Sequence, residues 1–346
     1  MKWLALILLL LVALVLTLGA YLYRPLAHEP VPADFTCLDL SDGSFVTLEP
    51  PTRAYGVGLS YAGHIHETAS NFDPEAAPPV FPKHPRGFVH DGAVVPTPTS
   101  DAMFSAADAL EPGLGPEARQ KLGEISPLLD YEVELGVVLL DDVDPKDLER
   151  DDYVPNLGFF IANDLSSRSL ALLGEGKPNR YEFWGASKSF PGFMPVGAQA
   201  FVPRVASANG LPCIEIQTRV NGEVRQQQNT RDMIYTPREM LRFVHAKYPD
   251  RPLEAGDVVL TGTPSGVAVR VPRPLVRLAN LVGLDRFAKL EAALGKDQSR
   301  FLEPGDEVVV VGEGLGDVSI TIGSADTPLD RGATANATAP ERRQGE

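Results

Sequence analysis

Residues 130–140, DYEVELGVVLL, place two glutamates two positions apart within an otherwise apolar run. Valine and leucine at this density favour a β-strand, and side chains two residues apart on a strand point to the same face. The same face continues with glycine and apolar residues, which predicts a strand buried on both sides with Glu132 and Glu134 at one end. Two carboxylates roughly 7 Å apart repel each other in such surroundings unless a cation lies between them. The pair therefore points to a divalent metal that needs a third ligand.

The best candidate for the third ligand ends the next apolar run, FFIAND. Phe159, Phe160 and Ile161 predict a buried strand, and Asp164 follows it at the edge of a sheet. Three carboxylates from two neighbouring strands suit a hard cation such as Mg²⁺, Mn²⁺ or Ca²⁺. The alternative is an aspartate that caps the turn or helix beginning at DLSSR, and the spacing alone leaves both interpretations open.

Strand-like runs follow one another along the chain and predict a β-rich mixed fold. These runs are AYGVGLSY, EVELGVVLL, LGFFIAND, CIEIQTRVNGEV, DVVLTG and EVVVVGEGLGDVSITI. Helical periodicity is found mainly at 236–247 and 275–295, and the second segment predicts a helix that covers the core. We interpret 101–129 and 272–302 as excursions from the fold.

The two ends of the chain have different compositions from the rest. Residues 3–23 contain no charge and are long enough to cross a bilayer as a helix, which predicts an uncleaved transmembrane anchor over residues 1–24. The excess of positive charge before this segment places the body on the extracytoplasmic side. Residues 25–52 predict a linker with a short hairpin, and residues 327–346 predict a disordered tail.

Charge and cysteine content exclude several functions. The net charge of −15 argues against nucleic acid as a partner and against electrostatic docking on anionic lipid, and favours small-molecule chemistry. The only cysteines are Cys37 and Cys213, without a CxxC motif, so neither a zinc cluster nor a disulfide framework is indicated. Of the two possible states, we expect two free thiols rather than a single disulfide between Cys37 and Cys213.

Six segments together resemble the fumarylacetoacetate hydrolase family. They occur in the order DYEVELGVV, IANDLSSR, SKSFPGFMPVG, VNGEVRQQQNTRDMIY, LEAGDVVLTGTPSGV and LEPGDEVVVVGEGLG, within residues 53–323. The resemblance implies an α+β, β-rich fold, a mixed β-sandwich roll over residues 53–326, usually assembled as a homodimer. It also implies that Glu132, Glu134 and Asp164 hold a divalent metal.

The resemblance implies roles for five further residues. In YGVGLSYAGHIHETA, His64 and Glu67 match the family's catalytic histidine–glutamate pair. In that pair the glutamate orients the imidazole so that it can take a proton from water. Lys188 matches the lysine that fixes substrate oxygens, and Arg168 matches an arginine that supports the carboxylates or the substrate. Thr263 lies in the Gly-Pro-rich loop LTGTPSGV, where a hydroxyl and backbone N–H groups could hold a substrate carboxylate. From the residues alone, His64 and Lys188 read as surface groups, Arg168 equally as part of a salt bridge within its turn, and the loop of Thr263 as a turn.

The implied activity is that of a metal-dependent hydrolase that cleaves a carbon–carbon bond in a 1,3-dicarbonyl or acylpyruvate-type 2-oxo acid. Decarboxylation or keto–enol tautomerisation of a 2-oxo acid such as oxaloacetate would use the same metal and is the alternative reaction. A noncatalytic, membrane-anchored binding protein is the alternative from another functional class.

Overall fold

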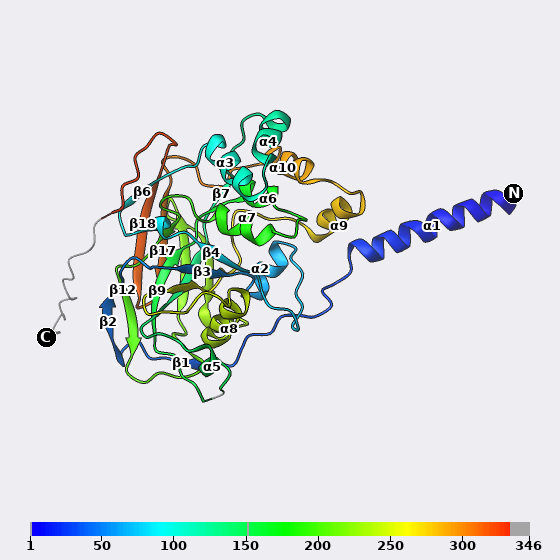
Figure 1. Ribbon diagram of the computed structural model, residues 1–346. Helices are drawn as coiled ribbons and strands as arrows, with labels where there is room; N and C mark the ends of the chain where they lie inside the picture. Colours follow the sequence, from blue (N-terminus) through cyan, green and yellow to red (C-terminus); the bar gives the residue numbers. More distant parts are fainter. Residues whose placement is uncertain (1, 151, 333–346) are drawn as a thin grey trace.

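The computed structural model describes residues 2–150 and 152–332 and has two large β-sheets with helices around them (Figure 1). One sheet has seven strands in the order β2-β12-β9-β8-β16-β3-β4, and the other has five in the order β15-β14-β17-β18-β6. Strands of the first sheet pack on the second, with β8 and β9 against β14, β17 and β18. The two apolar faces form the main core, which confirms the expected β-rich α+β sandwich.

The strands have the following bounds. They are β1 Thr36–Cys37, β2 Gly43–Thr47, β3 Ala54–Val57, β4 Val80–Lys83, β5 Phe88–Val89, β6 Ala93–Pro96, β7 Leu129–Asp130, β8 Val133–Leu139, β9 Leu157–Asn163, β10 Ser166–Ser167, β11 Met194–Pro195, β12 Gln199–Pro203, β13 Gly210–Leu211, β14 Glu215–Val220, β15 Glu223–Asn229, β16 Val258–Leu260, β17 Glu307–Gly312 and β18 Gly316–Gly323. The short pairs β1–β13, β10–β7 and β11–β5 lie outside the two large sheets.

The helices are mostly short. They are α1 Lys2–Leu22, α2 Ala62–Glu67, α3 Ser100–Leu110, α4 Leu114–Leu122, α5 Pro145–Leu148, α6 Arg168–Leu173, α7 Arg180–Ser187, α8 Pro237–Lys247, α9 Arg273–Leu281 and α10 Arg286–Leu294, with 3₁₀ turns at Pro85–Gly87 and Thr230–Asp232. The predicted helix at 236–247 is α8, which begins at a capping box of Thr236 and Glu239.

Strand β8 lies in the middle of the seven-stranded sheet, between β9 and β16. All of its residues are buried, as are all residues of β9, because both faces of the sheet are covered. The two strands are antiparallel, with Val133 opposite Asn163 and Leu139 opposite Leu157. This register brings the residue before β8 next to the residue after β9.

The two excursions contain helices that pack together beside the sheets. Helices α3, α4, α6, α7 and α10 share a separate apolar cluster that includes Phe104, Leu170, Phe183 and Leu290. The segment 275–295 is divided by Gly283, which has φ +71°, into α9 and α10. Only α10 covers the core as predicted, since α9 has no buried residue.

The segment before the sheet is joined to the body at two places. Strand β1 pairs with β13 and β2 with β12, so these two strands do not form a hairpin with each other. Cys37 in β1 and Cys213, two residues after the end of β13, form a disulfide with their Cα atoms 5.1 Å apart. Our preference for unbridged cysteines was wrong, because pairing of segments 176 residues apart leaves no local signal in the sequence.

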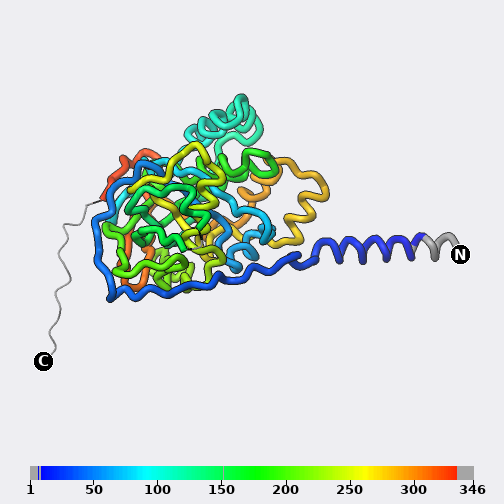
Figure 2. Tube along the Cα trace, turned by 60° about the horizontal axis from the view of Figure 1, so that its bottom comes forward, coloured from blue at the N-terminus to red at the C-terminus, as the bar shows by residue number. Residues whose placement is uncertain are grey.

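The predicted transmembrane anchor is also wrong. The apolar segment forms α1, which extends away from the body in both views (Figures 1 and 2). In residues 2–150 and 152–332, however, no helix combines the length and the apolar character needed to cross a membrane. At the carboxyl end of α1, Nη1 of Arg277 in α9 donates to the carbonyls of Tyr21 at 3.1 Å and Leu22 at 3.0 Å. The predicted extracytoplasmic location depended on the anchor and is withdrawn with it.

The carboxyl-terminal segment is bonded to β6 as far as the structure describes it. The amide of Asp330 donates to the Val94 carbonyl at 3.1 Å, and the amide of His90 donates to the Arg331 carbonyl at 2.9 Å. The predicted disorder for residues 333–346 lies outside the described residues.

Candidate metal centre

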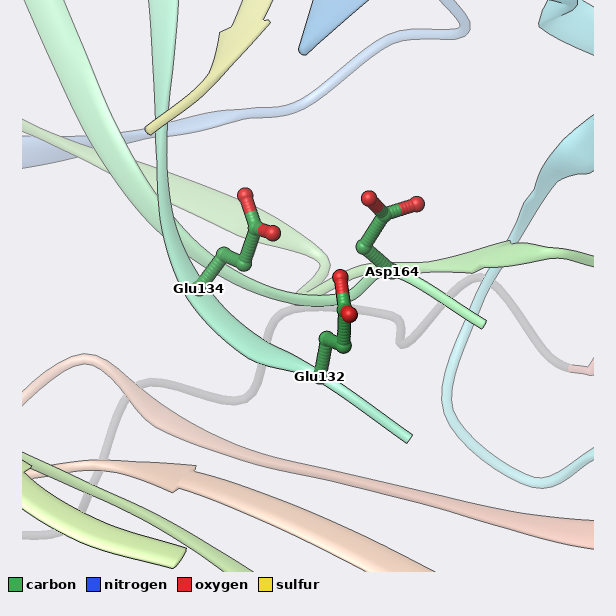
Figure 3. Close-up of side chains that lie close together, drawn as sticks. All are labelled: Glu132, Glu134 and Asp164. Atoms are coloured by element: carbon green, nitrogen blue, oxygen red, sulfur yellow. The ribbon is translucent and has the colours of Figure 1, made fainter. Parts of the chain in front are cut away.

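Three carboxylates converge where β8 begins and β9 ends (Figure 3). Oxygen atoms of Glu132, Glu134 and Asp164 all lie within 4.8 Å of one another. The three residues are buried, with exposed fractions of 3%, 3% and 0%. The sequence-based prediction that these residues lie together is therefore correct in geometry.

The antiparallel register explains why these side chains meet. The amide of Asp164 donates to the Glu132 carbonyl at 2.8 Å, and the amide of Glu132 donates to Oδ1 of Asn163 at 3.1 Å. The first bond continues the backbone pairing of β8 and β9 by one residue, and the second fixes Glu132 to the side chain at the end of β9. Glu132 and Glu134 then project from the same face of one strand, beside Asp164 on its neighbour.

Two buried lysines face the carboxylates. Nζ of Lys188 lies 2.6 Å from Oδ2 of Asp164 and also donates to Glu132. Nζ of Lys83 donates to Oδ1 of Asp164 and to the Lys188 carbonyl. Burial lowers the pKa of Lys188, but the charges of Asp164 and Glu132 outweigh burial and raise that pKa above its usual value. The ammonium of Lys188 is therefore held in the charged state inside the protein.

Arg168 links Glu132, just before β8, to Asp130, which in turn holds the loop 262–269. Its Nε lies 2.8 Å from Oδ2 of Asp130, and its Nη2 donates to Glu132. The buried carboxylate of Asp130 also accepts the amides of Ala268 at 2.7 Å and Val269 at 3.2 Å. Of the two interpretations of Arg168, the contact with Glu132 favours support of the carboxylates over a salt bridge confined to its own turn.

Glu134 differs from the other two carboxylates in its partners. Its Oε2 accepts the amide of Gly262 at 2.7 Å, and among the described residues no lysine or arginine donates to it. Burial and then the charge of Asp164 raise the pKa of Glu134 well above its usual value. By contrast, Lys188 and Arg168 outweigh burial at Glu132 and lower its pKa to about 2.

The charges and donor atoms fit a divalent cation. Counting Asp130, four buried carboxylates face three cationic side chains, those of Lys83, Lys188 and Arg168. A buried carboxylate without a cation is costly, and a hard metal ion would supply the missing positive charge. The three acidic residues offer oxygen donors only, which is the chemistry that Mg²⁺, Mn²⁺ and Ca²⁺ prefer.

His64 lies on α2, close enough to the centre to be influenced by its charges. The imidazole is 7% exposed, and its Nδ1 is buried without a hydrogen-bond partner in the described part of the chain. Burial lowers the pKa of His64 to about 4, and the opposing effect of Glu132 is smaller. The ring is consequently neutral at pH 7 and able to accept a proton.

Glu67 makes a different contact from the one expected. Its carboxylate accepts the backbone amide of Gly266 at 2.7 Å, and the described contacts include no hydrogen bond between Glu67 and His64. Burial raises the pKa of Glu67 despite that hydrogen bond. In this conformation the carboxylate of Glu67 holds the loop 262–269 through the amide of Gly266.

Thr263 lies in the same loop and is engaged within the protein. Its hydroxyl donates to the Val133 carbonyl at 2.9 Å and accepts from Nε2 of Gln226 at 2.8 Å. The side chain therefore fastens the loop to β8, which leaves backbone groups for any contact with a substrate carboxylate.

Sequence reasoning missed three residues at this centre. Lys83 is the last residue of the short strand VFPK, and a lysine that ends an apolar strand was an available signal. Asp130 opens the segment that contains the two glutamates, and its burial depended on the fold. Gln226 bonds to the amide of Val133 at 3.0 Å, a contact between distant strands without a local pattern.

Comparisons with known proteins identify relatives over most of the chain. Residues 53–323 match the family described as "Fumarylacetoacetate (FAA) hydrolase C-terminal". An uncharacterised protein of Methanocaldococcus jannaschii is 31% identical over 220 residues, which is 63% of this chain and 73% of that protein. The mitochondrial oxaloacetate decarboxylase of Dictyostelium discoideum is 27% identical over 72% of this chain and 97% of its own length. The mitochondrial oxaloacetate tautomerase FAHD2A of Bos taurus is 31% identical over 63% of this chain and 58% of its length.

A solved structure has the same fold. Fumarylpyruvate hydrolase from Pseudomonas aeruginosa, in complex with Mn²⁺ and pyruvate, superimposes with a TM-score of 0.50 at 20% identity, covering 87% of this chain and 99% of that one. Because the family match spans well over half of the sequence, the resemblance inferred from six motifs is confirmed, and the chain belongs to the fumarylacetoacetate hydrolase family.

Proposed function

We propose that this protein is a divalent-metal-dependent hydrolase that cleaves a carbon–carbon bond in an acylpyruvate-type 2-oxo acid. The observation that carries this proposal is the convergence of Glu132, Glu134 and Asp164 in a buried site where Glu134 has no cationic partner among the described residues. Members of the family are enzymes, including hydrolases, isomerases and decarboxylases.

Glu132, Glu134 and Asp164 would hold the cation, with Mg²⁺ or Mn²⁺ as the preferred ions. The Mn²⁺ and pyruvate in the fumarylpyruvate hydrolase structure support this choice of metal and of substrate class. When bound, a divalent ion would polarise the oxygens of a chelating 2-oxo acid and favour its enolate form. Arg168 would keep Glu132 in place for this purpose through its contact with Asp130.

His64 would act as the general base. Its neutral imidazole accepts a proton from a water molecule, whose oxygen attacks the acyl carbonyl carbon of the substrate. The carbon–carbon bond then breaks, its electron pair moves onto the 2-oxo acid as an enolate, and the proton returns to that enolate carbon. The products are a carboxylic acid and a shorter 2-oxo acid. The Lys188 ammonium, held charged by Asp164 and Glu132, would stabilise the developing negative charge.

A second candidate reaction is decarboxylation or tautomerisation of oxaloacetate. It is favoured by the Dictyostelium discoideum and Bos taurus relatives, which are an oxaloacetate decarboxylase and an oxaloacetate tautomerase. Both reactions also proceed through an enolate of a 2-oxo acid, so the same carboxylates and Lys188 would serve. They differ from hydrolysis in that no solvent oxygen enters the acid product.

The test uses the full-length chain loaded with Mg²⁺ or Mn²⁺. A panel of acylpyruvates and oxaloacetate is followed by loss of ultraviolet absorbance, with carbon dioxide release recorded for oxaloacetate. We expect turnover of an acylpyruvate that is lost in His64→Ala and Glu132→Ala. His66→Ala is the matched control, because His66 is an exposed histidine of the same helix that contacts Glu29 at 3.0 Å.

The outcomes separate the candidate functions. Incorporation of ¹⁸O from labelled water into the acid product supports hydrolysis. Consumption of oxaloacetate alone, insensitive to His64→Ala, would replace hydrolysis by decarboxylation or tautomerisation. Metal binding without turnover of any substrate would leave a noncatalytic binding role. We also propose that the chain forms a homodimer, which light scattering on the full-length protein tests.

A further inference from the structure

Helix α9 bonds to the carboxyl ends of two other helices through arginines one turn apart. Nη2 of Arg273 donates to the Ser70 carbonyl at 2.7 Å and to the Ile65 carbonyl at 3.2 Å, at the end of α2. Nη1 of Arg277 donates to the Leu22 carbonyl at 3.0 Å, at the end of α1. The views in Figures 1 and 2 place α9 where α1 meets the body. A positive charge at a helix carboxyl end is stabilising, so α9 fastens both helices.

A cavity of about 230 Å³ lies between these three elements. Its lining consists of two guanidinium groups, two amides, a phenol and small apolar groups, and none of the described residues contributes a carboxylate to it. The polar side chains are those of Tyr21, Asn71, Arg273, Arg277 and Asn280, and Ala69 lines the cavity beside them. Ala69 has φ +54°, a left-handed conformation that is rare for alanine and that ends α2 tightly beside the cavity.

The two arginines keep donors that the carbonyl contacts do not use. Among the described contacts, Nε and Nη1 of Arg273 make no hydrogen bond, and neither do Nε and Nη2 of Arg277. Both side chains are half-buried. Burial and then the charge of Arg277 lower the pKa of Arg273, an effect that Glu29 only partly offsets. Two guanidinium groups facing one small cavity repel each other unless an anion lies between them.

We propose that this cavity is a binding site for a small dianion, either inorganic phosphate or a short dicarboxylate. The free Nε and Nη2 of Arg277 form one edge of its guanidinium, which can donate two parallel hydrogen bonds to such an oxyanion. The free donors of Arg273 and the asparagine amides can supply further single bonds. The volume is below that of ordinary drug-sized pockets, which restricts the ligand to a few heavy atoms. Because the whole chain carries a net charge of −15, the attraction for an anion has to come from this local arginine pair.

The position of the cavity couples it to α2. Arg273 contacts the carbonyls of Ile65 and Ser70, and the amide of Val271, just before α9, donates to the Glu67 carbonyl at 3.3 Å. An anion shared by Arg273 and Asn71 would draw α9 and the turn after α2 together. Residues 64–71 would then open less often, which amide hydrogen exchange detects.

The experiment is calorimetric titration of the metal-free, full-length chain in a zwitterionic buffer, with inorganic phosphate in one arm and succinate in the other. We expect one saturable site per chain. Its affinity for the anion should fall at least tenfold in Arg277→Gln, and it should also fall in Asn280→Ala, which keeps both arginine charges. Arg204→Gln is the control for loss of one positive charge, because Arg204 is exposed, pairs with Asp42 and is not among the residues that line the cavity. Circular dichroism verifies that each variant is folded.

The two arms identify the ligand class. Saturable binding of phosphate alone points to phosphoryl ligands, and binding of succinate alone points to dicarboxylates. In either case the anion should slow amide exchange at residues 64–71 in the natural chain and have no such effect in Arg277→Gln. The proposal is overturned if neither anion binds saturably, or if Arg277→Gln and Asn280→Ala bind as well as Arg204→Gln does.

Discussion

The carboxylate of Glu67 lies 2.7 Å from the backbone nitrogen of Gly266 and accepts its hydrogen bond. Glu67, which the family resemblance assigns to the catalytic pair with His64, thus holds the loop 262–269 against α2. Asp130 holds the same loop from the other side, through the amides of Ala268 and Val269. The loop is therefore fixed by two carboxylates, one of which also belongs to the proposed catalytic pair.

Substitution of Glu67 should separate these two roles. In Glu67→Ala the amide of Gly266 loses its acceptor, and we expect the free energy of unfolding to fall by about 1–3 kcal/mol. In Glu67→Gln the amide oxygen can still accept that bond, so stability should be kept while the negative charge that would orient His64 is lost. Urea denaturation should therefore distinguish the variants, whereas kcat should fall in both. Equal stability of Glu67→Ala and the natural chain would contradict the role of Glu67 in holding the loop.

The burial of His64 predicts a pH dependence of stability. The pKa of His64 in the folded chain is about 4, below its usual value of 6.5, so the unfolded chain binds more protons between these values. The free energy of unfolding should therefore decrease as pH falls from about 6.5 to 4, by on the order of 3 kcal/mol from this residue.

The check is urea denaturation of the metal-free protein at a series of pH values. In His64→Gln the free energy of unfolding should change less with pH over this range, because the buried imidazole that resists protonation is gone. His66→Gln, at the exposed position on the same helix, should keep the slope of the natural chain. If His64→Gln keeps that slope as well, the neutral, buried state assigned to His64 is wrong.

The bridge between Cys37 and Cys213 predicts a large effect on stability. It closes a loop of 176 residues and joins the segment before the sheet to β13. Loop-closure entropy for a loop of this length predicts that Cys37→Ser with Cys213→Ser lowers the free energy of unfolding by roughly 3–5 kcal/mol. Thermal unfolding with and without a reductant measures this, and the double variant should be insensitive to the reductant. Insensitivity of the natural chain would show that the bridge does not form in solution.

The metal centre could be predicted from the sequence because its ligands mark the ends of strongly patterned strands. Alternation places Glu132 and Glu134 on one face, and the buried run before Asp164 places it at the edge of the next strand. The environment of these residues could not be predicted, because it comes from other parts of the chain. Lys83 reaches Asp164 from 81 residues away, and Gln226 reaches Val133 from 93 residues away.

Features that depend on packing were the ones predicted incorrectly. The apolar spacing of residues 275–295 predicts helix, but it does not reveal that Gly283 breaks the segment and leaves α9 outside the core. Likewise, the apolar composition of residues 3–23 does not show how the end of that helix contacts Arg277. In both cases a local pattern gives the type of element, while its surroundings are decided by residues distant in sequence.

The central claim is that Glu132, Glu134 and Asp164 form a divalent-metal site on which turnover depends. The most direct measurement is titration of the metal-free, full-length chain with Mn²⁺, followed by electron paramagnetic resonance, with turnover of the acylpyruvate and oxaloacetate panel recorded in the same samples. We expect one Mn²⁺ per chain and activity that rises in proportion to bound metal. In Glu134→Gln, which alters a direct ligand, Mn²⁺ affinity should fall by more than the roughly 10–100-fold typical for loss of an outer-shell partner. Glu291→Gln, at an exposed position on α10, should match the natural chain. Binding that Glu134→Gln leaves unchanged, or turnover without bound metal, would contradict the account.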